Sequence, residues 1–276
     1  MKIARIKINN NEHYGIVTEN QFQPIKVTRN DLGFENFLVS ETANFVSNGS
    51  PINLAEADFS WLPPIARPGK VICIGRNYLA HAEETGNKKE EVPLLFSKYP
   101  NCMVGHNSSV PYPSHTEYFD YEVELAVIMG KTASKLAESD DPLKYIFGYT
   151  VGNDLTARDV QRSEKQWTRG KAFDNSLPIG PTITTSDEMS NPSDKDIWLT
   201  VNGENRQLSN TSRLMFDIPY LIRYISQNIT LYPGDIIMTG TPSGVGMYMD
   251  PPGTLKKGDQ VACGVTDVGE LRFNII

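Results

Sequence analysis

Two glutamates interrupt a run of apolar residues between positions 121 and 129, and this combination constrains the fold more than any other feature of the sequence. The run reads YEVELAVIM, so that Glu122 and Glu124 are separated by a single residue. Side chains alternate along a β-strand, which points both carboxylates to the same face. Buried like charges are stable only when they gain protons or meet a cation such as Lys, Arg or a metal ion. The sequence therefore predicts a strand that carries a cation site, with a divalent metal as the natural occupant.

The composition is that of an ordinary globular protein that acts on small molecules. The 276 residues are 39% hydrophobic, which is enough for one large core, or for one core plus a small appended domain. A net charge of -7 and a pI near 5.2, without a Lys/Arg-rich run, argue against nucleic acid or an anionic membrane as a partner. The three cysteines are far apart and not in metal-ligand spacing, which argues against disulfides or a zinc site. With no signal-peptide pattern and no apolar stretch near the ~20 residues of a membrane span, we expect a cytoplasmic location.

Proline and glycine divide the chain near residue 66. Residues 1–26 alternate polar and apolar side chains around three asparagines at positions 9–11, which predicts a small β-hairpin. The segment 61–69 contains three prolines and a glycine and is typical of a linker. We therefore expect a small N-terminal β-rich domain at residues 1–65 and a larger domain at residues 66–276.

Strand patterns dominate the larger domain. One helix is expected at 217–228, from an apolar stripe of isoleucine and leucine, and shorter ones after Asn77 and after Asp154. The expected strands are 70–75, 122–129, 146–153, 197–201, 235–239, 260–265 and 270–275, with a turn at Asn202-Gly203. These patterns predict a mixed α+β fold that is mostly β, with a large and mainly antiparallel sheet system.

Asp154 adds a third acidic side chain to the two glutamates. It ends the expected strand 146–153, and it could either cap a helix at 155–161 or join Glu122 and Glu124. The two glutamates could likewise be a solvated face on an exposed strand edge. Taken together, however, three carboxylates supply the all-oxygen site that suits a hard cation, Mg²⁺ or Mn²⁺ before Ca²⁺.

A histidine and a glutamate follow the strand at 70–75. His81 and Glu84 are three residues apart and would share one face of a helix. A carboxylate that orients a histidine fixes its tautomer and stabilises the imidazolium, which is a general-base arrangement. A surface ion pair with the same spacing is the alternative.

A glycine-rich segment, TGTPSGVG at 239–246, resembles a phosphate-binding loop only superficially. It lacks the Gly-Lys-Ser/Thr ending, and no dinucleotide-binding fingerprint is present, which excludes a nucleotide site. Its backbone N–H groups and Thr241 are candidates to hold a substrate carboxylate. A tight turn without a binding role is the alternative.

From residue 66 to the C-terminus the sequence resembles the fumarylacetoacetate hydrolase family. Five motifs occur in the order typical of that family: GRNY at 75–78 with His81 and Glu84, DYEVELA at 120–126, GND at 152–154 with ARDVQ at 157–161, KAFD at 171–174, and TGTPSGVG at 239–246. Five ordered motifs are a specific signal.

The resemblance implies a catalytic domain of rolled mixed β-sheets, usually dimeric, with Mg²⁺ or Mn²⁺ bound to Glu122, Glu124 and Asp154. It implies that His81 with Glu84 is an acid/base dyad and that Lys171 stabilises an oxyanion. The residues that the resemblance suggests as substrate contacts are Arg76, Tyr78, Arg158, Gln161 and Thr241. A short N-terminal β domain is also similar to that of bacterial members of about this length.

Substrates of that family are β-dicarbonyl or 2-oxo acids, in which breaking a C–C bond leaves an enolate that a metal can stabilise. We expect metal-dependent hydrolysis of such a bond in an acylpyruvate-type acid. An oxaloacetate decarboxylase and a 2-hydroxyhepta-2,4-diene-1,7-dioate isomerase would use the same residues and remain alternatives. A non-catalytic protein that binds metal and a dicarboxylate is disfavoured, because it has no need of an acid/base dyad. The polar segment 85–92 fits either a lid over the substrate or a solvated loop.

Overall fold

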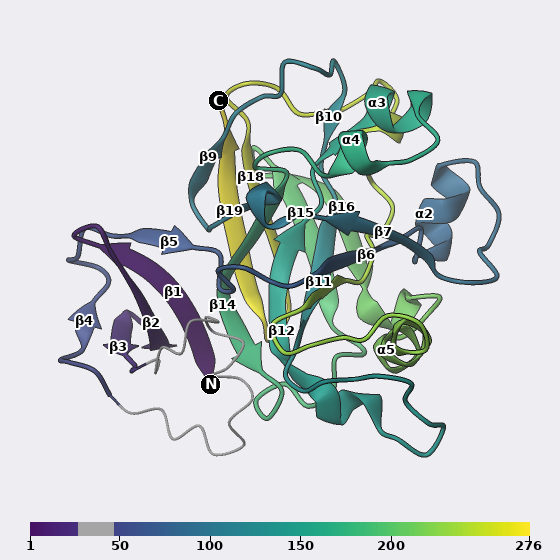
Figure 1. Cartoon of the computed structure of the whole chain (residues 1–276). Coiled ribbons are helices and arrows are strands. Elements are labelled where there is room, and N and C mark those ends of the chain that lie inside the picture. The colour runs from purple at the N-terminus through teal and green to yellow at the C-terminus, as the bar shows by residue number, and fades with distance from the viewer. Residues whose placement is uncertain (27–46) are drawn as a thin grey trace.

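The protein is mostly β-structure, arranged as one large and one smaller sheet (Figure 1). The computed structural model describes residues 1–26 and 47–276. Within these residues the strands form a twelve-stranded sheet, a five-stranded sheet and a two-stranded ribbon. The expected α+β class with predominant, mixed β-sheets is confirmed.

The large sheet contains the strands that surround the expected site. Its main path runs in the order β4 (Ile52–Asn53), β3 (Gln21–Pro24), β2 (Asn11–Thr18), β1 (Lys2–Ile8), β14 (Leu177–Thr185), β12 (Ile146–Asn153), β11 (Val123–Met129), β17 (Ile236–Met238), β6 (Val71–Gly75) and β7 (Leu94–Lys98). Two further strands pair off this path, β5 (Ser60–Leu62) with β1 and β8 (Met103–Val104) with β14. Most pairs are antiparallel, but β17 runs parallel to β6 and β14 runs parallel to β8.

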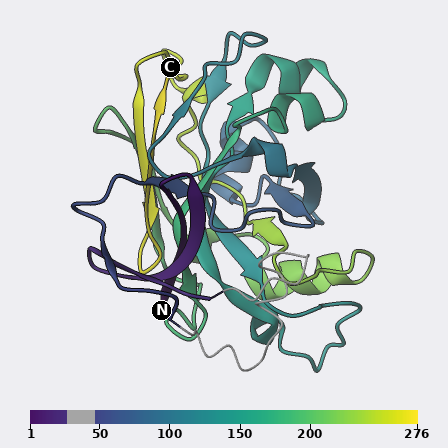
Figure 2. The same ribbon diagram turned by 60° about the vertical axis from the view of Figure 1, so that its left-hand side comes forward.

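The smaller elements complete the fold around this sheet. The five-stranded sheet has the order β16 (Glu204–Asn210), β15 (Asp196–Val201), β18 (Gln260–Val265), β19 (Gly269–Ile275) and β9 (Ser108–Val110). The ribbon pairs β10 (Phe119–Asp120) with β13 (Thr156–Ala157). The helices are α2 (Leu79–Glu84), α3 (Arg158–Ser163), α4 (Thr168–Lys171) and α5 (Ile218–Ser226), with short 3₁₀ turns η1 (Pro100–Cys102), η2 (Pro142–Tyr145), η3 (Thr211–Arg213) and η4 (Gly246–Tyr248). Figures 1 and 2 both place the N-terminal strands on the side of the molecule opposite to α2–α5.

Strand β11 lies in the middle of the large sheet and is buried along its whole length. Val123 and Leu125 belong to the core that the large sheet shares with the five-stranded sheet. Ala126 belongs to a second core on the opposite face. By alternation, Glu122 and Glu124 lie on the face of Ala126, so they form the polar end of an otherwise apolar surface. The carboxylates of Glu122 and Glu124 therefore lie in the interior of the protein.

The N-terminal strands extend the large sheet, because β1 pairs directly with β14. Asn9 and Asn10 join β1 to β2 with φ angles of 47° and 65°, as a two-residue type I′ turn requires. Ile3 packs in the second core beside residues of the larger domain. The sheet is therefore continuous across residue 66, and the division into domains at 1–65 and 66–276 stays a prediction.

All seven strands expected in the larger domain are present, each within one residue of its expected ends. Helix α5 begins after Asp217, whose side chain accepts a hydrogen bond from the backbone N–H of Tyr220 at 2.8 Å. The helix expected after Asp154 begins later, at Arg158, and its N-cap is Ala157. The capping role considered for Asp154 is therefore wrong, because its carboxylate lies among buried cations. None of the described helices is long and apolar enough to cross a membrane.

His106 lies at the seam between β5 and β19. Its ring meets that of Trp61 edge to face, with centroids 5.8 Å apart, and its Nδ1 accepts a hydrogen bond from the backbone N–H of Arg272 at 3.1 Å. Burial and the charge of Arg272 lower the pKa of His106 to about 4, against an opposing effect of Glu270. The folded protein therefore holds this imidazole neutral.

This lowered pKa predicts that His106 makes folding stability depend on pH. The unfolded chain binds the proton near pH 6.5 and the folded chain only near pH 4, so the stabilisation is complete above pH 6.5 and is lost as the pH falls toward 4. We expect the free energy of unfolding, measured with urea between about pH 7 and 4.5, to fall more steeply in the wild type than in His106→Asn. Asparagine keeps an acceptor for the backbone N–H of Arg272, but its side chain does not bind a proton in this pH range. Parallel pH profiles of the two proteins would contradict the assignment.

Candidate active site

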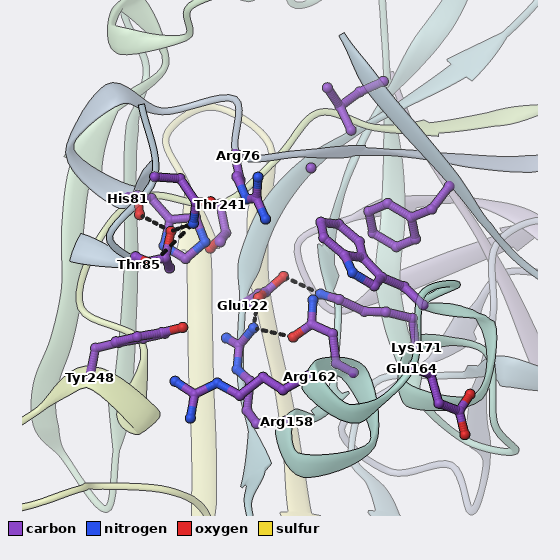
Figure 3. A pocket seen from close by; sticks show the side chains of 16 residues that line it. Arg76, His81, Thr85, Glu122, Arg158, Arg162, Glu164, Lys171, Thr241 and Tyr248 are labelled. Atoms are coloured by element: carbon purple, nitrogen blue, oxygen red, sulfur yellow. Dashed lines mark hydrogen bonds and ion pairs between the residues drawn. The ribbon is translucent and has the colours of Figure 1, made fainter. Parts of the chain in front are cut away.

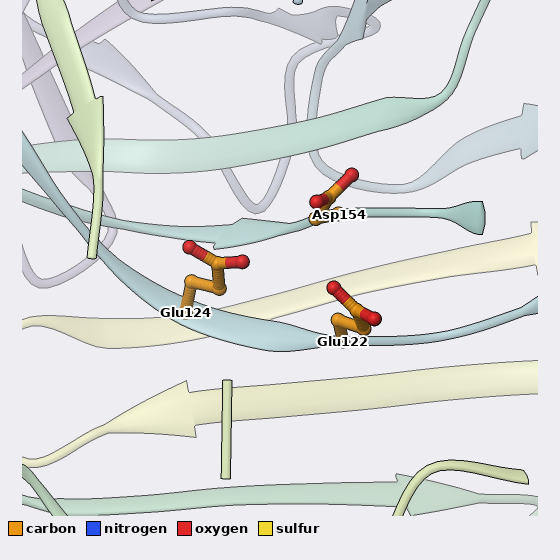
Figure 4. Close-up of side chains that lie close together, drawn as sticks. All are labelled: Glu122, Glu124 and Asp154. Atoms are coloured by element: carbon orange, nitrogen blue, oxygen red, sulfur yellow. The ribbon is translucent and has the colours of Figure 1, made fainter. Parts of the chain in front are cut away.

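Glu122, Glu124 and Asp154 come together at one end of β11 and β12 (Figure 4). One carboxylate oxygen of each lies within 4.8 Å of those of the other two, and none of the three residues is more than 4% exposed. The backbone N–H of Asp154 donates to the carbonyl of Glu122 at 2.8 Å, which continues the pairing of the two strands past their ends. We call these three residues the carboxylate cluster.

Three buried cations surround the carboxylate cluster. The Nζ atom of Lys171, from α4, is 2.7 Å from Glu122 Oε2 and 2.8 Å from Asp154 Oδ2. Lys98, at the end of β7, places its Nζ 2.8 Å from Asp154 Oδ1. Arg158, at the start of α3, places its Nη1 2.7 Å from Glu122 Oε1. Three separate elements therefore supply positive charge to two of the three carboxylates.

The charge balance is uneven within the cluster. Burial raises the pKa of Glu122, but the charges of Lys171 and Arg158 outweigh it and hold that pKa at about 2. Burial and the charges of Asp154 and Glu122 raise the pKa of Glu124 well above its usual range. The raised pKa favours a proton on Glu124, and a hard divalent cation with oxygen ligands would take the place of that proton. The donor set thus fits Mg²⁺ or Mn²⁺.

His81 and Glu84 lie on α2 and are in contact. His81 Nδ1 is 3.1 Å from Glu84 Oε2, and the other carboxylate oxygen of Glu84 accepts a hydrogen bond from the backbone N–H of Gly244 at 2.8 Å. His81 is only 4% exposed, so the surface ion pair considered as an alternative is wrong. The carboxylate fixes the orientation of the imidazole at Nδ1, and Nε2 has no hydrogen-bond partner among residues 1–26 and 47–276, in a side chain that lines a cavity.

One cavity of about 250 Å³ connects the dyad with the carboxylate cluster (Figure 3). The expected site residues that line it are Arg76, His81, Glu122, Arg158, Gln161, Lys171 and Thr241. Its other walls include the aromatic residues Phe96, Trp167 and Tyr248 and the cation Arg162. Three of the expected site residues that do not line the cavity are placed beside residues that do: Glu84 contacts His81, Asp154 contacts Lys171, and Glu124 has an oxygen within 4.8 Å of one of Glu122.

Tyr78 is the expected substrate contact that the structure does not bring to the cavity. It immediately precedes α2, and its side chain is 2% exposed. Its hydroxyl is buried without a hydrogen-bond partner among residues 1–26 and 47–276, and burial together with the charge of Glu124 raises its pKa well above the usual range. The structure therefore does not support a substrate contact by Tyr78.

The glycine-rich loop at 239–246 uses its backbone N–H groups differently from the expectation. Three of them donate to carboxylates of the chain itself: Gly240 to Glu124 (2.7 Å), Gly244 to Glu84 (2.8 Å) and Gly246 to Asp120 (2.8 Å). These groups are therefore not available for a substrate carboxylate. Thr241 alone of this loop lines the cavity.

Gln207, on β16, is a site residue that the sequence did not reveal. Its Nε2 donates to Thr241 Oγ1 and to the carbonyl of Pro242, both at 2.8 Å, and its Oε1 accepts from the backbone N–H of Val123 at 3.0 Å. Val123 stands between the two glutamates of the cluster. This 1% exposed amide thus ties the five-stranded sheet to both the loop and β11. Nothing in the polar sequence of β16 marks it as buried.

Lys98 is a second site residue that the sequence did not reveal. Besides Asp154, its ammonium contacts the carbonyl and the hydroxyl of Ser176, each at 2.9 Å, and the carbonyl of Lys171. It therefore fixes a carboxylate of the cluster and the chain that follows α4. The apolar residues 94–96 of β7 were the only signal in the sequence that indicated a buried strand.

Comparison with known proteins identifies the family. Residues 70–276 match the model described as the C-terminal domain of fumarylacetoacetate (FAA) hydrolase. The mitochondrial oxaloacetate tautomerase of Bos taurus is 41% identical over 225 residues, which cover 81% of this chain and 71% of that protein. The crystal structure of 2-hydroxyhepta-2,4-diene-1,7-dioate isomerase from Mycobacterium marinum superposes with a TM-score of 0.79 at 30% identity, covering 100% of this chain and 98% of that one.

A third relative carries ligands. The crystal structure of fumarylpyruvate hydrolase from Pseudomonas aeruginosa, in complex with Mn²⁺ and pyruvate, has a TM-score of 0.70 at 33% identity and covers 79% of this chain and 91% of that one. Fold and cavity define an enzyme with a buried acidic site beside a histidine that contacts a glutamate. The chain belongs to the fumarylacetoacetate hydrolase family.

The three hydrogen bonds of Gln207 predict a large effect of its replacement. Gln207→Leu leaves the N–H of Val123 and the carbonyl of Pro242 buried without partners, so we expect the free energy of unfolding to fall by about 3 kcal/mol. Gln166, at an exposed position just before α4, provides a matched control, and Gln166→Leu should change stability by about 0.5 kcal/mol or less. Urea denaturation measures both. Equal effects of the two substitutions would refute the bridging role.

Proposed function

We propose that this chain is a metal-dependent enzyme that transfers protons on a small 2-oxo diacid, and that keto–enol tautomerisation of oxaloacetate is its reaction. The observation that carries the proposal is that His81, oriented by Glu84, and the carboxylate cluster meet at one cavity. The name of the bovine relative supports this choice of reaction. Proton transfer needs a base and charge stabilisation but no attacking water.

The proposed metal ligands are Glu122, Glu124 and Asp154. Their buried oxygens suit Mg²⁺ or Mn²⁺, and the Mn²⁺ in the Pseudomonas aeruginosa relative supports the choice of a hard cation. When bound, the cation would supply Lewis-acid stabilisation of the negative charge that develops on the 2-oxo group.

His81 is the proposed acid and base. Its Nε2 takes a proton from C3 of the keto acid, the electron pair moves through C2 to the 2-oxo oxygen, and the imidazolium then gives the proton to that oxygen. Glu84 stabilises the imidazolium between these two steps, because its carboxylate contacts Nδ1. A positioned base of this kind contributes about 10²- to 10⁴-fold in rate.

Lys171 is the proposed stabiliser of the oxygen that becomes negative. Its ammonium lines the cavity and is held by Glu122 and Asp154, which together raise its pKa against the effect of burial and keep it charged. One such contact commonly accounts for about 10²- to 10³-fold in rate. Arg76, Arg158, Gln161 and Thr241 line the same cavity and are the proposed substrate contacts.

Hydrolysis of a C–C bond in an acylpyruvate is the second candidate. The fumarylpyruvate hydrolase relative favours it, and a water molecule activated by His81 would be the nucleophile. Decarboxylation of oxaloacetate would draw on the same charged groups. The products separate the three reactions, because hydrolysis gives two acids, decarboxylation releases CO₂ and tautomerisation leaves the mass unchanged.

The cellular location and the homodimer stay predictions. The bovine relative is named as mitochondrial, which says where that protein acts, whereas a cytoplasmic location was expected for this chain. The partner that the proposal requires is a small 2-oxo acid.

The direct test follows the decay of the ultraviolet absorbance of enol-oxaloacetate. We expect Mg²⁺ or Mn²⁺ to be required, so that treatment with EDTA abolishes the acceleration and added metal restores it. Mass analysis of the same reaction should find oxaloacetate unchanged in mass. Cleavage of an acylpyruvate without any effect on the oxaloacetate enol would instead establish the hydrolase.

Two variants should separate proton transfer from metal binding. We expect His81→Gln to lower the rate by at least about 100-fold while Mn²⁺ binding, measured by calorimetry, is retained. Glu124→Gln should lose both, because it removes a proposed ligand charge. His115→Gln, at an exposed position, is the matched control for the first variant and should behave as the wild type. Full turnover by His81→Gln would eliminate His81 as the base.

A further inference from the structure

Three arginines line the cavity, and they differ in whether a carboxylate of the protein pairs with their guanidinium group. Arg76 pairs with Glu90 at 2.9 Å. Arg158 is buried and pairs with Glu122 at 2.7 Å. Arg162 makes no ion pair with any residue in the described part of the chain. One guanidinium at the cavity is therefore free to meet a charge that the protein does not supply.

Arg162 is nevertheless held in place. Its guanidinium carbon lies 5.0 Å from the centre of the Tyr248 ring, on η4. A cation over an aromatic face is attracted to it without being neutralised. Figure 3 shows the two side chains approaching each other at the cavity, beside Arg158. The ring thus orients Arg162 and leaves its N–H groups for a ligand.

The position of Arg162 on α3 sets the distance to the catalytic groups. It follows Arg158 by four residues, so the two side chains lie on one face of the helix, about one turn or 5–6 Å apart. Arg158 contacts Glu122 of the carboxylate cluster. A ligand whose 2-oxo acid end lies at the cluster would therefore reach Arg162 with a group only a few atoms away.

The geometry points to Arg162, oriented by Tyr248, as the receptor for the second carboxylate of the substrate, and hence as the residue that makes the site prefer 2-oxo diacids to 2-oxo monoacids. A planar guanidinium binds a carboxylate through two parallel N–H···O bonds, which gives direction as well as charge. The inference rests on the proposed function and specifies its substrate class.

The test compares oxaloacetate with its 4-methyl ester, which keeps the carbon skeleton but lacks the second negative charge. In the Mg²⁺-loaded protein, Arg162→Gln should lower the ratio of kcat/KM for the diacid to that for the ester by about 10- to 100-fold, mainly through KM. Tyr248→Leu should lower this ratio about threefold, since it removes only the orienting ring. Lys165→Gln makes the same change in net charge three residues away, outside the cavity lining, and should leave the ratio unchanged.

Binding of the same two compounds, measured by calorimetry, separates this inference from the proposed reaction. Turnover of neither compound would refute the tautomerase, yet tighter binding of the diacid by the wild type, lost in Arg162→Gln, would still support the diacid receptor. An unchanged ratio in Arg162→Gln, an equal effect of Lys165→Gln, or a wild type that binds both compounds equally or not at all would overturn it.

Discussion

Much of the structure around the site is arranged to compensate the burial of three carboxylates at the end of β11 and β12. An unpaired buried charge costs several kcal/mol, and like charges within 4.8 Å add repulsion to that cost. The compensating cations come from separate elements: Lys98 from β7, Lys171 from α4 and Arg158 from α3. Each of these elements must therefore pack in one position for the sheet to keep its acidic end buried. The site and the fold are stabilised by the same contacts.

The loop at 239–246 meets the same electrostatic requirement with backbone groups. Its glycines allow a close approach that other residues would prevent, since a Cβ on Gly244 would lie 2.0 Å from the carbonyl oxygen of Arg206, and one on Gly240 would lie 2.7 Å from Cβ of Asn77. Both glycines also have φ near +100°. The loop resembles an anion-binding sequence because its N–H groups do bind anions, but the anions belong to the protein. What remains for a substrate is the charge on the cavity walls.

The sequence predicted those features that depend on local pattern. Alternation along one strand placed Glu122 and Glu124 on one face, and the apolar stripe at 217–228 predicted α5, because both patterns act within a few residues. Gln207 and Lys98 could not be found in this way. Their role depends on which strands become neighbours and on which backbone groups those strands leave unpaired, and neither is encoded in the spacing of residues along one segment. The family resemblance identified more of the candidate site residues than periodicity did. It gave no information on how the side chains of these residues are oriented.

Proton transfer, hydrolysis and decarboxylation would all use these charged groups, so the access of water to the cavity bears directly on the outcome. One wall is formed by Arg76, which has a φ of 54° and holds its guanidinium 5.4 Å from the ring centre of Trp167. Gly75 makes this packing possible, because a Cβ there would lie 2.8 Å from the Trp167 ring. The pair between Arg76 and Glu90 ties the segment 85–92 to this wall, but its side chains are 28% and 26% exposed, so it contributes about 1 kcal/mol or less. A hydrolase must admit one water molecule beside the substrate, whereas a tautomerase gains from excluding it. With a contribution this small, the pair between Arg76 and Glu90 restrains the segment 85–92 beside the cavity only weakly.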